Sequence, residues 1–197
     1  MEITVWHLEQ DSPDQIRAAR EPAVDDGRGD GDGGVRIVRA ELPSPELNRF
    51  LYTAVGGDWH WTDRLAWTWQ QWQDWLDRPG VETWVAYLRG TPAGYVELDG
   101  SVDGVVEIAY FGLMAPFAGR GIGGHLLTTA LRHAWSLAGR HPGLSPAKRV
   151  IVNTCSLDGP AALANYRARG LRIARTETRL TETTATPGPW PGADKPR

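Results

Sequence analysis

The amino-acid sequence predicts an α/β (α+β) fold: a mixed β-sheet of about seven strands with helices on its faces. The chain has 197 residues, of which 41% are hydrophobic, enough for the core of one ordinary domain. Short segments rich in β-branched and aromatic residues occur along most of it. Between them lie stretches whose apolar residues recur every three or four positions, as in helices that pack on a sheet. We therefore expect a single domain over residues 1–180.

The N-terminal part is predicted to hold two strands and a helix. The strands are "EITVWHLE" (2–9) and "VRIVRAEL" (35–42), which are rich in β-branched residues. Residues 11–34 contain many Gly, Asp and Pro without an apolar period, which predicts a flexible loop. Ser44 before Pro45 is typical of an N-cap with proline at the first helical position, so a helix should follow.

The middle of the chain is predicted to form one more helix and three strands. Apolar residues at spacings of four, three and four suggest a helix whose stripe packs in the core: Leu65, Trp69, Trp72 and Leu76. Three apolar-rich segments separated by turns follow, at residues 83–90, 91–100 and 104–114. Consecutive strands with short connections favour an antiparallel meander.

The C-terminal part is predicted to alternate helices and strands. Residues 123–139 place six apolar side chains on one helical face: Leu126, Leu127, Ala130, Leu131, Ala134 and Trp135. A strand is expected at 148–155, a short helix at 158–170 with Asp158 as its cap, and a last strand at 171–180. Residues 181–197 should be a disordered tail.

Composition excludes several classes of protein. The formal net charge is −3 with mixed signs, so no basic field for nucleic acid is expected. No run approaches the roughly 20 apolar residues of a membrane span, and the start does not resemble a signal peptide. Cys155 is the only cysteine, which excludes an internal disulfide and a multi-cysteine metal site. We expect a cytoplasmic protein, a monomer or homodimer without metal.

A glycine-rich stretch directly before the long helix suggests an anion site. The segment "AGRGIGG" (118–124) places glycines where a helix N-terminus exposes unpaired N–H groups and a partial positive charge. The spacing is neither that of a dinucleotide fold nor of a P-loop, because no Gly-Lys-Ser/Thr follows. A glycine turn that only caps the helix would have the same sequence.

Together with a second motif, this stretch resembles the GNAT superfamily of acyl-CoA-dependent N-acyltransferases. "AGRGIG" is similar to the family's Arg/Gln-x-x-Gly-x-Gly/Ala loop, and "NYRARGL" to its Tyr-x-x-x-Gly-Phe, with Tyr166 and Gly170 in place. The two motifs occur in the family's order, and the resemblance covers about residues 81–175. Two positions depart from the pattern: Ala118 replaces the usual Arg or Gln, and Gly159 stands where an Asn often lies.

The resemblance implies a binding site for acetyl-CoA. In the family a strand edge bonds the pantetheine arm and the glycine loop holds the pyrophosphate. Carried onto this sequence, the cofactor-binding residues are Phe111, Gly112, Leu113, Ala118, Gly119, Arg120, Gly121, Ile122, Gly123, Gly124 and Asp158. The partner implied is an amine of a small molecule or peptide. Alternatives are an acyl-CoA sensor of the same fold without turnover, or a protein that binds ATP at the glycine loop.

Two residues are candidates for acid–base catalysis. An amine with a pKa of about 10.4 must lose a proton before it attacks a thioester, and Glu107, on a central strand, is the candidate base. Tyr166 occupies the family's position for the acid that protonates the departing thiolate. The alternatives are a solvated strand glutamate and a packed tyrosine. Cys155 is more easily explained as a buried strand thiol than as a nucleophile.

The amine acceptor is expected between the first helices. In the family the acceptor enters opposite the cofactor, over the first helices and the loop between them. In this sequence that loop is rich in tryptophan and carries an acidic and a basic residue. The candidate substrate-binding residues are Trp59, Trp61, Asp63, Arg64 and Tyr110. In this hypothesis Asp63 attracts an amine and Arg64 a carboxylate. A packed loop with a surface ion pair is the alternative. His125 and His133 lack a metal-binding pattern and are expected on a helix surface.

Overall fold

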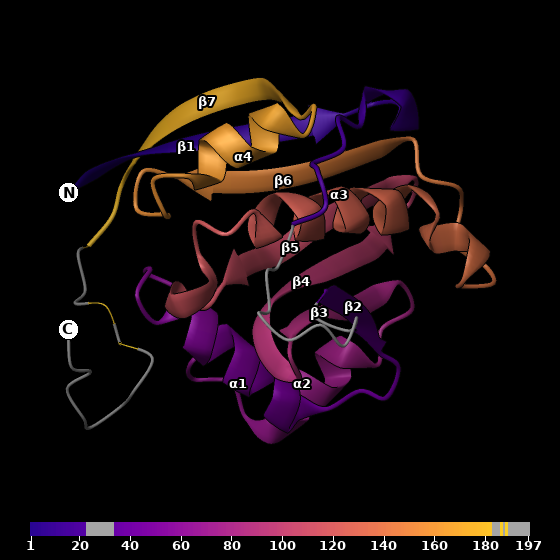
Figure 1. Ribbon diagram of the computed structural model, residues 1–197, viewed down its shortest axis with the longest axis horizontal. Helices are drawn as coiled ribbons and strands as arrows, with labels where there is room; N and C mark the ends of the chain where they lie inside the picture. Colours follow the sequence, from indigo (N-terminus) through magenta and orange to yellow (C-terminus); the bar gives the residue numbers. More distant parts are fainter. Residues whose placement is uncertain (23–33, 183–185, 187, 189–197) are drawn as a thin grey trace.

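The computed structural model of the chain describes residues 1–22, 34–182, 186 and 188. Its strands are β1 (Glu2–Gln10), β2 (Val35–Ala40), β3 (Val81–Leu88), β4 (Thr91–Val102), β5 (Val105–Leu113), β6 (Arg149–Cys155) and β7 (Arg172–Leu180). Its helices are α1 (Pro45–Gly56), α2 (Trp69–Leu76), α3 (Ile122–Trp135) and α4 (Ala162–Ala168), with 3-10 turns η1 (Pro13–Gln15), η2 (Ala115–Phe117) and η3 (Leu137–Gly139). The strands form one sheet in the order β2-β3-β4-β5-β6-β1-β7, with helices on both faces (Figure 1), which confirms the predicted fold class.

The sheet is mixed because one pair of neighbours runs in parallel. The strands from β2 to β5 are antiparallel, and the predicted meander of β3, β4 and β5 is confirmed. A parallel pair needs a crossover, and α3 connects β5 to β6 in this way. The first strand, β1, lies between β6 and β7 and is antiparallel to both.

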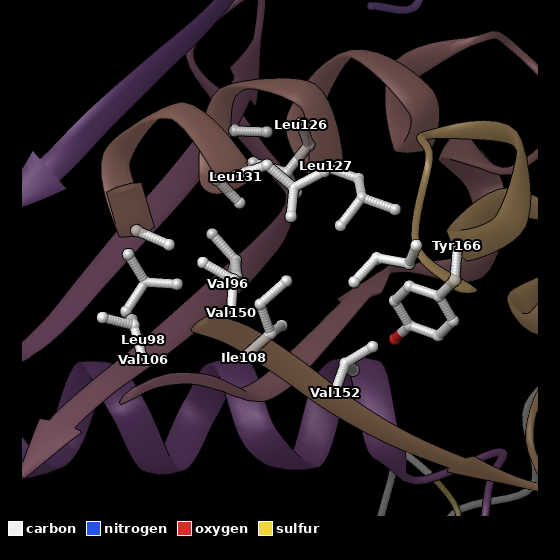
Figure 2. Packing of buried hydrophobic residues seen from close by; sticks show 14 of the residues in the cluster. Val96, Leu98, Val106, Ile108, Leu126, Leu127, Leu131, Val150, Val152 and Tyr166 are labelled. Carbon is white, nitrogen blue, oxygen red and sulfur yellow. The ribbon is translucent and has the colours of Figure 1, made fainter. Parts of the chain in front are cut away.

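Each face of the sheet carries its own hydrophobic core. Figure 2 shows Leu127 and Leu131 of α3 above Val96, Ile108 and Val150 of the sheet. On the opposite face, side chains of α1 pack on β3 and β4 in a smaller cluster of Leu51, Val55, Val85 and Tyr95. Successive residues of β4 alternate between these cores, so its central part is buried on both sides.

The start of α1 agrees with the sequence prediction, whereas that of α2 does not. Ser44 caps α1 as predicted, because its hydroxyl accepts a hydrogen bond from the Leu47 N–H at 3.2 Å. The stripe predicted for α2 is wrong in part. Thr68 forms a capping box that starts α2 at Trp69, so Leu65 lies in the preceding turn. Trp69 is 55% exposed, and only Trp72 and Leu76 of the stripe are buried.

The N-terminal segment expected to be flexible is partly held in place. After η1, the N–H of Arg17 donates to the carbonyl of Arg169 at 3.2 Å, and the N–H of Ala19 donates to the Thr128 hydroxyl of α3 at 2.9 Å. Residues 11–22 therefore follow the surface of α3. Residues 23–33 and most of the expected tail lie outside the described residues.

None of the described helices is long and apolar enough to cross a membrane.

Candidate active site

A groove of about 930 Å³ opens where β5 and β6 separate. The two strands pair only from Val105 opposite Arg149 to Ile108 opposite Val152. Beyond this point β5 continues to Leu113 and remains paired with β4, so its edge over residues 109–113 has no partner in β6. Unpaired backbone groups on a strand edge can bind an extended ligand as an added strand would.

A β-bulge lies at the start of this free edge. Glu97 of β4 pairs with Tyr110, and the next residue, Leu98, pairs with Ile108, so Ala109 has no partner in β4. An extra residue in one strand reverses the side-chain alternation beyond it.

The bulge determines which side chains of β5 share a face. Ile108 packs in the core beneath α3 (Figure 2). Beyond the bulge, Phe111 packs against the same core. Glu107 and Tyr110, separated by three positions, therefore both lie on the opposite face, toward α1. Both line the groove.

The glycine-rich loop forms the N-terminal end of α3. Gly119 and Gly121 have φ angles of +76° and +78°, a left-handed conformation that favours glycine. Gly121 is the N-cap and provides no side chain to bond the first-turn N–H groups of α3. Gly123 and Gly124, in that first turn, line the groove without a Cβ. The loop can therefore bring several backbone N–H groups close to an anion.

Most residues predicted to form the site line this one groove. They are Trp59, Trp61, Asp63, Arg64, Glu107, Tyr110, Phe111, Gly112, Leu113, Ala118, Gly119, Gly121, Gly123, Gly124, Asp158 and Tyr166. Two predicted residues do not line it. The side chain of Ile122 is buried in the core beneath α3, and Arg120 is exposed outside the groove.

Glu107 lies on β5 beside the end of its pairing with β6. Its carboxylate accepts a hydrogen bond from the Asn153 amide of β6 at 3.1 Å. Burial, with the neighbouring Asp99 carboxylate, raises the pKa of Glu107 above its ordinary value. A carboxylate with a raised pKa is a better proton acceptor than an ordinary glutamate.

Tyr166 extends from α4 into the core beneath α3 and is 5% exposed. Its ring packs near Phe111, with centroids 5.8 Å apart, and its hydroxyl points toward Val152 (Figure 2). No hydrogen bond joins this hydroxyl to the described residues. Burial, with the negative charge of Asp158, raises the pKa of Tyr166, so the hydroxyl stays protonated at neutral pH.

Asp158 does not cap the last helix as the sequence predicts. The N-cap of α4 is Ala161, without a side-chain hydrogen bond. The Asp158 carboxylate instead accepts hydrogen bonds from the Thr154 hydroxyl at 2.5 Å and from the Cys155 N–H at 3.0 Å. The carboxylate therefore closes the turn after β6 and does not cap α4.

The other end of the groove is aromatic. Trp59, Trp61 and Trp75 line it together with Tyr110 of β5. Trp61 contacts Tyr110 edge to face, with centroids 4.9 Å apart, and the Tyr110 hydroxyl donates to the Asp63 carboxylate at 3.2 Å. The connection between α1 and α2 and the bulged strand thus form this end together.

Arg64 was expected to be free to bind a substrate carboxylate, but it is buried and already paired. Its Nη1 donates to Oε1 of Glu97 at 2.8 Å, and the exposed fractions of the two side chains are 6% and 1%. The guanidinium carbon lies 4.0 Å from the ring centroid of Trp75 and 4.5 Å from that of Tyr110. Arg64 is therefore a paired, stacked part of the wall.

Sequence reasoning missed several residues at the groove. Asn153 could have been found, because it is a polar residue directly after the apolar run Val150–Val152, two positions from Ile151, which pairs with Glu107. Asn165 also lines the groove, one residue before Tyr166. Glu97 gave no signal, because a charged residue in a strand usually faces solvent.

Cys155 lines the groove, but burial raises the pKa of its thiol, which disfavours the thiolate needed for a nucleophile. Across residues 1–22 and 34–182, no three His, Cys, Asp or Glu side chains gather as metal ligands would. His133 of α3 stacks on Trp84 with ring centroids 3.6 Å apart.

Residues 45–171, more than half of the chain, match the model of the acetyltransferase (GNAT) family. The chain belongs to the GNAT acetyltransferase family. The matched range includes the glycine loop, Glu107 and Tyr166, and the resemblance stated from the two sequence motifs is confirmed.

Solved structures of GNAT proteins share the fold. A GCN5-related N-acetyltransferase from Kribbella flavida has a TM-score of 0.59 and 18% identity, covering 89% of this chain and 56% of its own. One from Sphaerobacter thermophilus has a TM-score of 0.55 and 19% identity, covering 88% and 49%. An aminoglycoside acetyltransferase from an uncultured soil metagenomic sample, in complex with sisomicin, has a TM-score of 0.50 and 16% identity, covering 77% and 95%.

The chain spans about half the length of the first two of these proteins. No curated protein matches the sequence.

Proposed function

We propose that this GNAT protein transfers the acyl group of acetyl-CoA to a primary amine by direct attack on the thioester. The observation that carries the proposal is that four elements converge on one groove: the free edge of β5, the N-terminus of α3, Glu107 and Tyr166. Each supplies a part that the reaction requires.

The groove fits the shape and charge of the donor. Residues 109–113 offer unpaired backbone groups along which an extended pantetheine arm can bind as an added strand. At the end of that edge lies the first turn of α3, where Gly121, Gly123 and Gly124 line the groove without side chains of their own and can turn backbone N–H groups toward a pyrophosphate. The donor supplies an activated thioester.

In this proposal two side chains carry the proton transfers. Glu107, on the face toward α1, accepts a proton from the attacking amine, either directly or through a water molecule. Tyr166, from α4, donates its proton to the departing sulfur. The two residues come from opposite faces of the sheet and both reach the gap between β5 and β6, so the amine and the donor enter from different sides.

Gly123→Glu tests the donor site. The φ of Gly123 is not left-handed, and an added Cβ would lie 3.5 Å from Leu113, an ordinary contact, so the fold should persist. The new carboxylate would lie where the pyrophosphate must bind, and we expect the affinity for acetyl-CoA to fall at least about tenfold. Isothermal titration calorimetry measures this. Gly139→Glu is the matched control, because Gly139 is open and lies outside the groove. Equal losses in both variants would refute the site.

Glu107→Gln tests the base through pH. The rate should rise with pH through an apparent pKa above the usual glutamate range, because only the ionised carboxylate accepts a proton and burial raises its pKa. The variant retains an oxygen for the Asn153 hydrogen bond but cannot accept the proton. We expect kcat/KM to fall about tenfold to hundredfold near pH 7, with the deficit shrinking as the amine itself deprotonates at higher pH. Profiles of kcat/KM that run parallel for both proteins would exclude Glu107 as the base.

A further inference from the structure

The aromatic end of the groove contains one positive charge that is already neutralised. Arg64 is bonded to Glu97 at 2.8 Å, and neither side chain is exposed by more than 6%. Aromatic rings cover its guanidinium, with Trp67, Trp75 and Tyr110 all having centroids within 4.5 Å of its central carbon. Arg64 lines the groove, but its charge is already paired with the buried Glu97 carboxylate, so this wall presents a neutralised pair rather than a free cation to an anionic ligand.

Two negative charges at this end are left without a counter-charge. Asp63 is exposed, and its one hydrogen bond among the described residues comes from the neutral hydroxyl of Tyr110 at 3.2 Å. Glu107 is bonded to the neutral amide of Asn153. Neither carboxylate forms an ion pair within the described part of the chain. Both face a groove with tryptophan walls, where a positive charge is attracted by ring faces as well as by carboxylates.

We propose that the acceptor is a diamine without a carboxylate: one amino group reacts beside Glu107, and a second, protonated amino group binds Asp63. The proposal rests on the acyl-transfer function proposed above and adds the class of acceptor. The alkyl chain between the two amino groups packs on Trp59, Trp61 and Trp75. A carboxylate on the same molecule would lie near Asp63 and Glu107, where the one arginine of the wall, Arg64, is already paired with Glu97, and this opposes binding.

Three probes of one size separate these contributions: 1,5-diaminopentane, pentylamine, which lacks the second amino group, and lysine, which adds a carboxylate to the diamine. Isothermal titration into the protein in the presence of CoA should show the diamine binding at least about tenfold more tightly than either of the others. Asp63→Asn should reduce the preference for the diamine over pentylamine to about threefold or less. Asp58→Asn removes an exposed charge from the same loop outside the groove and should leave that preference intact.

Lysine binding as tightly as the diamine, or an unchanged preference in Asp63→Asn, would overturn the inference. Acetyl transfer to the same probes, followed by mass spectrometry, separates this failure from that of the proposed function. Transfer to lysine and diamine at equal rates would sustain the transferase and reject the diamine site. Selective binding of the diamine without any transfer would sustain the site and reject the transferase.

Discussion

Tyr166→Phe should lower kcat for acyl transfer by about 10²- to 10⁴-fold, the loss typical of removing a general acid. The ring of Tyr166 belongs to the core beneath α3, and phenylalanine keeps that packing. The hydroxyl has no hydrogen-bond partner among the described residues, so its removal leaves no buried group unpaired. We therefore expect the free energy of unfolding and the affinity for acetyl-CoA to stay near their original values.

The measurement is steady-state kinetics, with urea unfolding and calorimetry on the same samples. Tyr87→Phe is the matched control, since Tyr87 is a partly buried tyrosine of β3 outside the groove, and its kcat should not change. A Tyr166→Phe variant with normal kcat would remove Tyr166 from the mechanism. A variant that loses activity only in proportion to its stability would make it a packing residue.

Arg64→Met should destabilise the protein by about 3–5 kcal/mol, because it leaves the carboxylate of Glu97 buried without its counter-charge. Glu97 is fully buried and would retain only the neutral donors of Trp75 and Asn48. Urea unfolding measures the change. The double variant Arg64→Met/Glu97→Leu should recover much of the loss, because it removes the unpaired charge as well.

Arg78→Met is the matched control, since the Arg78 side chain of the Arg78–Asp99 pair is 34% exposed and its loss should cost about 1 kcal/mol or less. A loss for Arg64→Met no larger than this, or no recovery in the double variant, would contradict the role assigned to the buried pair.

The Arg64→Met deficit should also depend on pH. Burial already raises the pKa of Glu97 above 4.5, and removal of Arg64 raises it further. Between the unfolded and folded pKa values the folded variant holds a proton that the unfolded chain has released. Unfolding therefore releases a proton in this pH range, and the variant should lose stability as pH rises above about 4.5. Urea unfolding at pH 5 and pH 8 tests the sign.

Elements whose signal is local could be predicted from the sequence. The cap of α1 needs only Ser44 and Pro45, and the meander needs three apolar segments with short turns between them. The glycine loop and Tyr166 lie in two short motifs, which led to the correct family. Two other predictions were wrong because other local hydrogen bonds formed. Thr68 caps α2 so that it starts four residues after the apolar stripe begins, and the Asp158 carboxylate bonds donors at the end of β6 instead of the first turn of α4.

The sequence by itself therefore determined the class of fold, the family and most of the residues that line the groove. Only the tertiary structure decided three features. Strand β1 lies between β6 and β7 because strand pairing depends on partners some 150 residues away. The bulge at Ala109 places Glu107 and Tyr110 on one face, whereas an unbroken period of two would separate them. Glu97 neutralises Arg64 across 33 positions of sequence, because burial makes each charge unfavourable without the other.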